Sequence, residues 1–135
     1  MKCLSFSSIL IALVLLTVNS CKLESSSFQK QDVFLYISGW ELPDTAKVST
    51  PFNIALSSGI DNSCIHNLQF VISNYDAITF RVYAQATYIN HGEDCYDVVV
   101  PKDTVISGNL SEIGKYYFLF LQNNYWIKDS IIIIP

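Results

Sequence analysis

The chain has 135 residues, and its eight Lys and Arg residues against 12 Asp and Glu residues give a net charge of −4. Nucleic-acid binding needs a basic patch and docking on anionic lipid needs clustered Lys and Arg, so this scattered positive charge argues against both. Half of the residues are hydrophobic, and the length is that of one domain able to bury its own core.

The first residues have the order of a signal peptide. Lys2 precedes an apolar run over residues 9–18, which is too short for a membrane-spanning helix of about 20 residues. Residues 18–21, Val-Asn-Ser-Cys, end this run and resemble the lipobox of bacterial lipoproteins. The resemblance implies a cleaved signal peptide over residues 1–20 and a lipid on Cys21. Several acyl chains on one residue would then anchor the protein to a membrane.

The next residues predict a tether. Residues 21–31 are polar and Ser-rich, which is typical of a flexible linker. Lys22 rather than Asp follows the lipidated cysteine, and by resemblance to the enterobacterial sorting rule this favours the outer membrane, on either its periplasmic or its surface face. The expected address is the cell envelope, with the lipid as the contact to the membrane. A folded domain is predicted over residues 32–135.

From Asp32 onward the sequence predicts strands and no helix. The chain is rich in Val, Ile, Thr, Tyr and Phe and carries turn residues at short intervals, such as Ser58-Gly59 and Asn123-Asn124. About seven short strands in a chain of this length predict an all-β sandwich. The predicted strands are 33–40, 48–57, 65–74, 78–90, 95–101, 115–122 and 126–134.

Three of these strands alternate apolar and polar residues with a period of two, which predicts one buried face. The last strand ends in four consecutive isoleucines, residues 131–134, and is predicted to be buried on both faces or to be an edge awaiting a partner. The predicted core residues of the alternating strands are Phe52, Ile54, Leu56, Leu68, Phe70, Ile72, Ile78, Phe80, Val82, Ala84 and Ala86.

The stretch from Leu110 to Phe118 contains a Leu, then Gly114, then Tyr116. It resembles the tyrosine corner of immunoglobulin-like folds, which implies that the Tyr116 hydroxyl bonds back to the upstream backbone. The resemblance implies an immunoglobulin-like β-sandwich of about seven antiparallel strands. Phe118 stands where that family has its second cysteine, so the likeness is closer to bacterial surface modules than to antibody domains. An unrelated β-fold with a Gly-x-Tyr turn is the alternative.

Cys64 and Cys95 are the two cysteines outside the signal peptide and its lipidation site. In an exported protein an even pair predicts a disulfide, because the compartment is oxidising. The alternative is a four-ligand zinc site in which both cysteines join His66 and His91.

Catalytic motifs are absent from the sequence. There is no Gly-x-Ser-x-Gly nucleophile motif, no P-loop and no dinucleotide fingerprint. The acidic residues 93, 94 and 97 are interpreted as solvated loop residues, because catalysis needs a cleft that shifts a pKa. The prediction is a non-enzyme without a cofactor.

Outward-facing aromatic residues favour binding. Tyr83, Tyr117 and Leu119 fall on the predicted outer faces of their strands, where they indicate a site for an envelope protein or a glycan. A covering loop or strand is the structural alternative. The alternative function is a small metal-binding protein or enzyme centred on His66 and His91. The other aromatic residues considered for a surface platform are Trp40, Tyr88, Tyr96, Tyr125 and Trp126.

Three tripeptides combine Asp, then Ser or Thr, then a small or aliphatic residue. They resemble the O-glycosylation sequon of exported proteins of the Bacteroidota, with acceptors at Thr45, Thr104 and Ser130. The resemblance points to a small exported lipoprotein of that group. The alternative is that Asp-Thr and Asp-Ser simply open β-strands.

Overall fold

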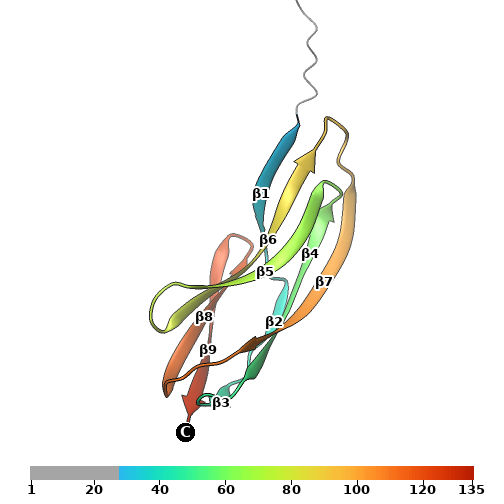
Figure 1. The fold of residues 1–135 in the computed structure, drawn as a ribbon. Helices are drawn as coiled ribbons and strands as arrows, with labels where there is room; N and C mark the ends of the chain where they lie inside the picture. Colours follow the sequence, from blue (N-terminus) through green and yellow to red (C-terminus); the bar gives the residue numbers. More distant parts are fainter. Residues whose placement is uncertain (1–27) are drawn as a thin grey trace, which may run out of the picture.

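The computed structural model describes residues 28–135 (Figure 1). The predicted signal peptide, Cys21 and most of the predicted tether lie outside the described residues. The end of that tether is different from the prediction, because residues 29–31 already belong to the first strand and pair with the strand that ends at Asn90.

The described residues form β-strands and no helix, as the composition predicts. The first described strand starts at one end of the molecule and the last strand finishes at the other (Figure 1). The strands are β1 (Gln29–Leu35), β2 (Gly39–Glu41), β3 (Thr45–Lys47), β4 (Phe52–Asn62), β5 (Ile65–Asn74), β6 (Thr79–Asn90), β7 (Asp97–Gly108), β8 (Gly114–Gln122) and β9 (Tyr125–Ile134).

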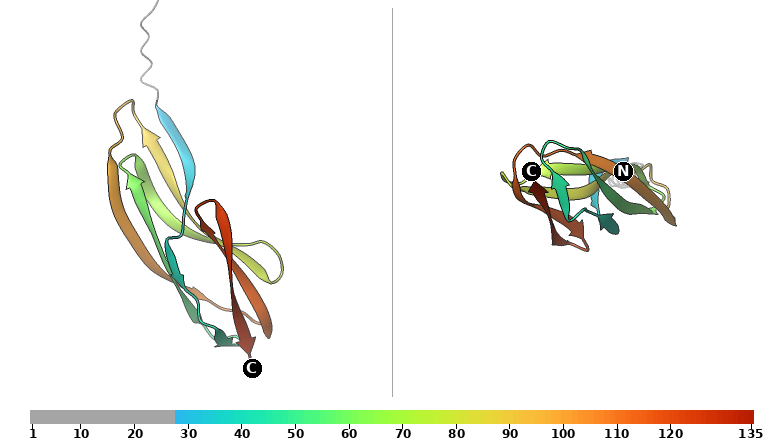
Figure 2. Two further views of the ribbon diagram at one scale, coloured as in Figure 1. Left: turned by 180° about the vertical axis from the view of Figure 1, so that it is seen from behind. Right: turned by 90° about the horizontal axis from the view of Figure 1, so that it is seen from below.

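Two sheets share one core, which is the β-sandwich that the strand pattern predicts. The larger sheet has the order β1-β6-β8-β9-β3, with β5 paired to the other edge of β6, and the smaller sheet has the order β2-β4-β7 (Figures 1 and 2). Two pairs, β6 with β8 and β3 with β9, are parallel. The prediction of only antiparallel pairing, in about seven strands, was therefore too simple.

The predicted strand 33–40 is wrong as one element, because the chain leaves the larger sheet within it. β1 ends at Leu35 and β2 begins at Gly39 in the smaller sheet. Between them Ile37 is fully buried, and its N–H donates to the carbonyl oxygen of Leu121 at 2.8 Å. The buried hydroxyl of Ser58 donates to the Tyr36 carbonyl at 2.6 Å. These contacts satisfy backbone groups that the interrupted ladder leaves unpaired.

The predicted turn at Ser58-Gly59 is also wrong, because β4 continues through it to Asn62. Gly59 lies opposite Pro101 in the pairing with β7. A Cβ atom at Gly59 would lie 3.3 Å from the carbonyl oxygen of Val100, so the glycine serves a close strand approach instead of a turn. This pairing also lengthens β7, which was predicted to end at 101 and extends to Gly108.

The alternation correctly predicts the centre of the core. Seven of the predicted core residues are buried. Phe70, Ile72 and Phe80 are partly buried and pack against this core. Ile78 is the exception, 47% exposed just before β6 begins. The fully described core is Ile37, Phe52, Ile54, Leu56, Leu68, Val82, Ala84, Ala86, Tyr116, Phe118, Phe120, Ile131 and Ile133.

An aromatic stack joins the two sheets. The ring of Trp40 in β2 lies parallel to the ring of Phe120 in β8, with 4.3 Å between their centroids. The Trp40 indole N–H donates to the Asp129 carboxylate in β9 at 2.9 Å. Trp40 was considered as a surface aromatic, but it is half-buried and fills the space between the sheets.

The C-terminal isoleucines are buried on one face only. Ile131 and Ile133 are fully buried, whereas Ile132 and Ile134 are 45% and 40% exposed. β9 lies between β8 and β3, so it is not an edge strand either. Burial on both faces is therefore wrong, because the period-two alternation continues to the end of β9. An edge awaiting a partner is wrong as well, because the short strand β3 pairs with that edge.

Tyr116 makes the hydrogen bond that the corner prediction requires. Its ring is buried at the start of β8, and its hydroxyl donates to the carbonyl oxygen of Glu112 at 3.2 Å. Leu110, in the same loop, packs against the core. The bond therefore ties the β7–β8 loop to the strand that follows it.

We expect Tyr116→Phe to lower the free energy of unfolding by about 1–3 kcal/mol, because it removes the partner of the Glu112 carbonyl and leaves the ring in place. Tyr117→Phe is the matched control and should change this free energy by less than about 0.5 kcal/mol, since residue 117 faces outward. Urea denaturation of both variants measures the difference. Equal stability of Tyr116→Phe and wild type would contradict a structural role for the hydroxyl.

Candidate functional site

The outer face of the larger sheet contains a hollow of about 390 Å³. This volume falls in the range of small-molecule sites, about 300–1,000 Å³. Aromatic rings and hydrogen-bonding groups share its surface. The lining residues are Phe34, Tyr36, Ser73, Arg81, Tyr83, Leu121, Asn124 and Trp126.

The hollow forms where β6 changes partners along one edge. β1 pairs with β6 from Ala84 to Asn90, and β8 pairs with it from Thr79 to Val82. Tyr83 lies between these two registers, so its side chain stands at the junction. Figure 2 shows the two partners in succession, with β1 toward one end of the molecule and the β8–β9 hairpin toward the other. The change of partner thus opens a depression in a sheet face.

The β8–β9 turn forms one wall of the hollow. Asn123 and Asn124 connect the strands with φ values of 46° and 68°, as in a two-residue type I′ hairpin, where Asn is favoured. The Asn124 side-chain oxygen accepts a hydrogen bond of 2.8 Å from the Tyr36 hydroxyl. This bond links the turn to the segment that follows β1.

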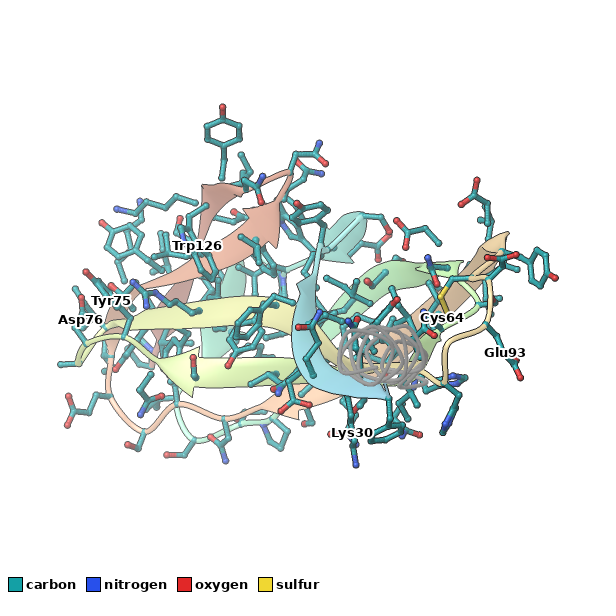
Figure 3. The ribbon with its side chains drawn as sticks, turned by 90° about the horizontal axis from the view of Figure 1, so that it is seen from above. Lys30, Cys64, Tyr75, Asp76, Glu93 and Trp126 are labelled. Carbon is teal, nitrogen blue, oxygen red and sulfur yellow. A yellow bond between two sulfur atoms is a disulfide. The ribbon has the colours of Figure 1, made fainter. Side chains whose placement is uncertain are left out.

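Arg81 is the only arginine in the chain, and it lines the hollow from β6. Its guanidinium carbon lies 4.1 Å from the centroid of the Tyr75 ring and 5.3 Å from that of the Trp126 ring. Both residues lie on the same side of the molecule in Figure 3. The Arg81 Nε atom is buried and has no hydrogen-bond partner within residues 28–135. The two rings therefore orient the cation at the hollow.

The structure places one of the three predicted binding residues at the hollow. Tyr83 lines it and packs edge-on against Phe34, with ring centroids 5.3 Å apart. Tyr117 and Leu119 lie farther along the same outer face and do not line it. Lys128 covers the Tyr117 ring, with Nζ 3.6 Å from the centroid.

An acid of the β5–β6 turn lies near this face. Asp76, in the β5–β6 turn, accepts a hydrogen bond of 2.9 Å from the Ile78 N–H, and this bond holds the pKa of Asp76 below its ordinary value. The positive charge of Lys128 contributes in the same direction. Asp76 is therefore ionised at neutral pH and offsets part of the local positive charge.

Sequence reasoning missed most of the other residues that line the hollow. Phe34 alternates with Val33 and Leu35, so period-two analysis of the first strand would have placed it outward. Arg81 alternates with the core residues Phe80 and Val82, which predicts that it faces outward, but a single outward arginine forms no recognisable motif. Tyr36 lines the hollow because the chain crosses between the sheets there, and Asn124 lines it from the β8–β9 turn. No local sequence pattern predicts that either residue lines a hollow.

The predicted disulfide between Cys64 and Cys95 is confirmed, with 5.5 Å between the two Cα atoms. In Figure 3 it lies on the side of the molecule opposite Trp126. A second hollow of about 200 Å³ lies beside it, lined among others by His66 and His91, both exposed. The Phe28 and His91 rings approach to 5.0 Å.

The zinc alternative does not fit this arrangement. The sulfur atoms of Cys64 and Cys95 are bonded to each other, so neither is a thiolate ligand. Within residues 28–135, no three His, Cys, Asp or Glu side chains are grouped so that they could hold a metal ion.

The three sequon-like sites all lie within strands. Thr45 opens β3 directly after Asp44 and is exposed, as the strand-opening alternative requires. Thr104 and Ser130 are half-buried and lie inside β7 and β9, so their aspartates do not open these strands.

Comparison with known proteins finds no matching family model, no matching curated protein and no matching solved structure. The part of the chain from residue 28 onward contains no helix long and apolar enough to cross a membrane.

Replacing Cys64 and Cys95 together by Ser should lower the free energy of unfolding by about 3 kcal/mol, because the bond closes a loop between residues 31 apart and restricts the unfolded chain. Urea denaturation of the double variant and of reduced wild type should agree. Mass spectrometry of the non-reduced protein should find the peptides joined and about two mass units below the reduced pair. Two free thiols in the non-reduced protein would contradict the bond.

Proposed function

We propose that this protein is a lipid-anchored, non-catalytic binding module of the cell envelope, and that it binds its ligand in the hollow on the outer face of the larger sheet. The hollow is the observation that carries the proposal. It combines aromatic surface with a few polar groups, which is the composition of small-molecule sites. A glycan fits this concave site better than a protein does, because a protein partner buries about 800 Å² of its own surface over a broad face.

The chemistry of the lining supports binding without catalysis. The residues at the hollow contribute one guanidinium, one amide, hydroxyls and aromatic rings. Those eight residues include no carboxylate, imidazole or thiol, so the lining supplies no general base that would activate the Ser73 hydroxyl as a nucleophile. The polar groups are suited to orienting a ligand.

The proposed address rests on the sequence. The order of basic residue, apolar run and Val-Asn-Ser-Cys supports lipidation of Cys21, and Lys22 supports the outer membrane. The hydrogen bond of Tyr116 to Glu112 supports an immunoglobulin-like form of the sandwich, since that family uses such a corner. A tethered sandwich would present the hollow to ligands at the envelope.

We expect Cys21→Ala to move the protein from the membrane fraction to the soluble fraction of a bacterial host, because the lipid is the proposed contact to the membrane. Fractionation followed by immunoblotting measures this. Cys64→Ser with Cys95→Ser is the control and should leave the protein in the membrane fraction. Membrane association that persists in Cys21→Ala would mean that the apolar run is an uncleaved anchor.

Tyr83→Ala should lower the affinity for glycan at least about tenfold, because the ring lines the hollow and aromatic residues often dominate binding energies. Tyr125→Ala is the matched control, since this tyrosine is 72% exposed and does not line the hollow. Binding of the detergent-solubilised full chain to an array of defined saccharides measures both. Equal binding by Tyr83→Ala and wild type would move the site elsewhere.

Changing Tyr117 and Leu119 together to Ser tests whether the ligand extends along the face. A long ligand should lose affinity in this variant, whereas a ligand confined to the hollow should not. If wild type binds no saccharide and both Tyr83→Ala and this double variant lose a cross-linked envelope protein, the ligand is a protein.

A further inference from the structure

We infer that the ligand of the hollow is an acidic saccharide whose carboxylate is bound by Arg81. This inference rests on the proposed function, because it names the class of ligand for the same site. It is carried by the placement of the single arginine of the chain among aromatic rings and hydroxyl groups.

The charge around the hollow favours an anion. The chain has a net charge of −4, yet the outer face of β6, β8 and β9 presents Arg81, Lys115 and Lys128. Asp76 is the acid beside Lys128 on this face. Asp32 in β1 is a second acid of this outer face. Arg81 is the one charged side chain among the residues that line the hollow, so the lining itself is positive and attracts an anionic ligand against the net charge of the protein.

Arg81 is held in a conformation suited to a carboxylate. A guanidinium presents paired N–H donors that match the two oxygens of a carboxylate, and such paired bonds are stronger than neutral hydrogen bonds. The Tyr75 and Trp126 rings fix the position of the cation before any ligand arrives. The Nε atom is buried, so the two terminal Nη groups are the donors that would face the carboxylate.

The rest of the hollow fits a sugar ring. The faces of Tyr83 and Trp126 offer apolar surface for the C–H groups of a pyranose. Ser73, Asn124 and the Tyr36 hydroxyl supply donors and acceptors for sugar hydroxyls. A uronic or sialic acid carries a carboxylate, hydroxyls and an apolar ring face in one residue, so it matches all three features together.

The test uses acidic saccharides paired with their neutral methyl esters, because each pair differs only in the charge of the carboxylate. Oligomers of uronic acids and sialic-acid-terminated glycans are titrated into the detergent-solubilised full chain by calorimetry. At least one acid should bind tenfold or more tightly than its ester, and its affinity should fall as salt is raised.

Arg81→Gln should remove the preference for the acid over the ester. Arg81→Lys keeps the charge but loses the paired donors, and it should retain an intermediate preference. Lys30→Gln is the control, since Lys30 also carries a positive charge but lies opposite Ile89 near the far end of β6 and does not line the hollow. It should leave the preference unchanged. A thermal unfolding midpoint equal to that of wild type verifies that each variant is folded, and Arg81→Lys serves alone if Arg81→Gln does not fold.

Three outcomes would overturn the inference. Equal binding of acid and ester would show that charge is not recognised, and the proposed function would survive if Tyr83→Ala still lost that binding. Tighter binding of an acidic peptide than of every acidic saccharide would assign the site to a protein ligand. Absence of binding to every acidic saccharide would also reject this ligand class. The proposed binding function would then be tested separately, by whether wild type cross-links to an envelope protein and Tyr83→Ala does not.

Discussion

The passage of the chain from one sheet to the other between β1 and β2 is the constraint on which the rest of the structure depends. Ile37 is fully buried at the crossing, and burial of such a side chain stabilises by about 1.5–3 kcal/mol. The N–H groups of Ile37 and Ser38 donate to Leu121 and Ser57, each at 2.8 Å, and the Ser58 hydroxyl binds the Tyr36 carbonyl. These contacts replace the interrupted ladder. Because β1 leaves there, the remaining edge of β6 is free to pair with β8, and the hollow forms at the change of partner.

The sequence predicts the fold well wherever local chemistry decides it. Residues 65–74 form β5 as predicted, and Asn123-Asn124 closes the β8–β9 hairpin because Asn tolerates positive φ. The alternation at Phe52, Ile54 and Leu56 identifies the buried face. The errors occur where pairing with strands distant in the sequence determines the local structure. Gly59 was predicted to lie in a turn, but in the structure it lies within β4 where the backbone of β7 comes close.

The candidate site could be predicted only in part, for the same reason. Tyr83 was expected on an outer face because its neighbours alternate with it, and this expectation depends on one strand alone. The hollow itself depends on segments that are far apart in the sequence: β1 and the residues after it, β5, β6, β8, the β8–β9 turn and β9. No periodicity in one segment reveals that Phe34 lies beside Tyr83 or that Trp126 covers Arg81. The disulfide was easier to predict, since an even pair of cysteines in a chain expected to be exported predicts a bond without knowledge of the fold.

The energetics of Arg81 favour a binding role over a stabilising one. Ordering an arginine side chain costs about 1.5–2 kcal/mol of conformational entropy. Cation–π contacts at sites that are not fully desolvated return about 0.5–1 kcal/mol each, so the rings of Tyr75 and Trp126 leave little net gain in stability. The arrangement instead fixes the cation in advance, and a ligand that meets an ordered partner loses less entropy on binding. The disulfide lies on the side opposite Trp126 in Figure 3, so it stabilises the fold without occupying the hollow.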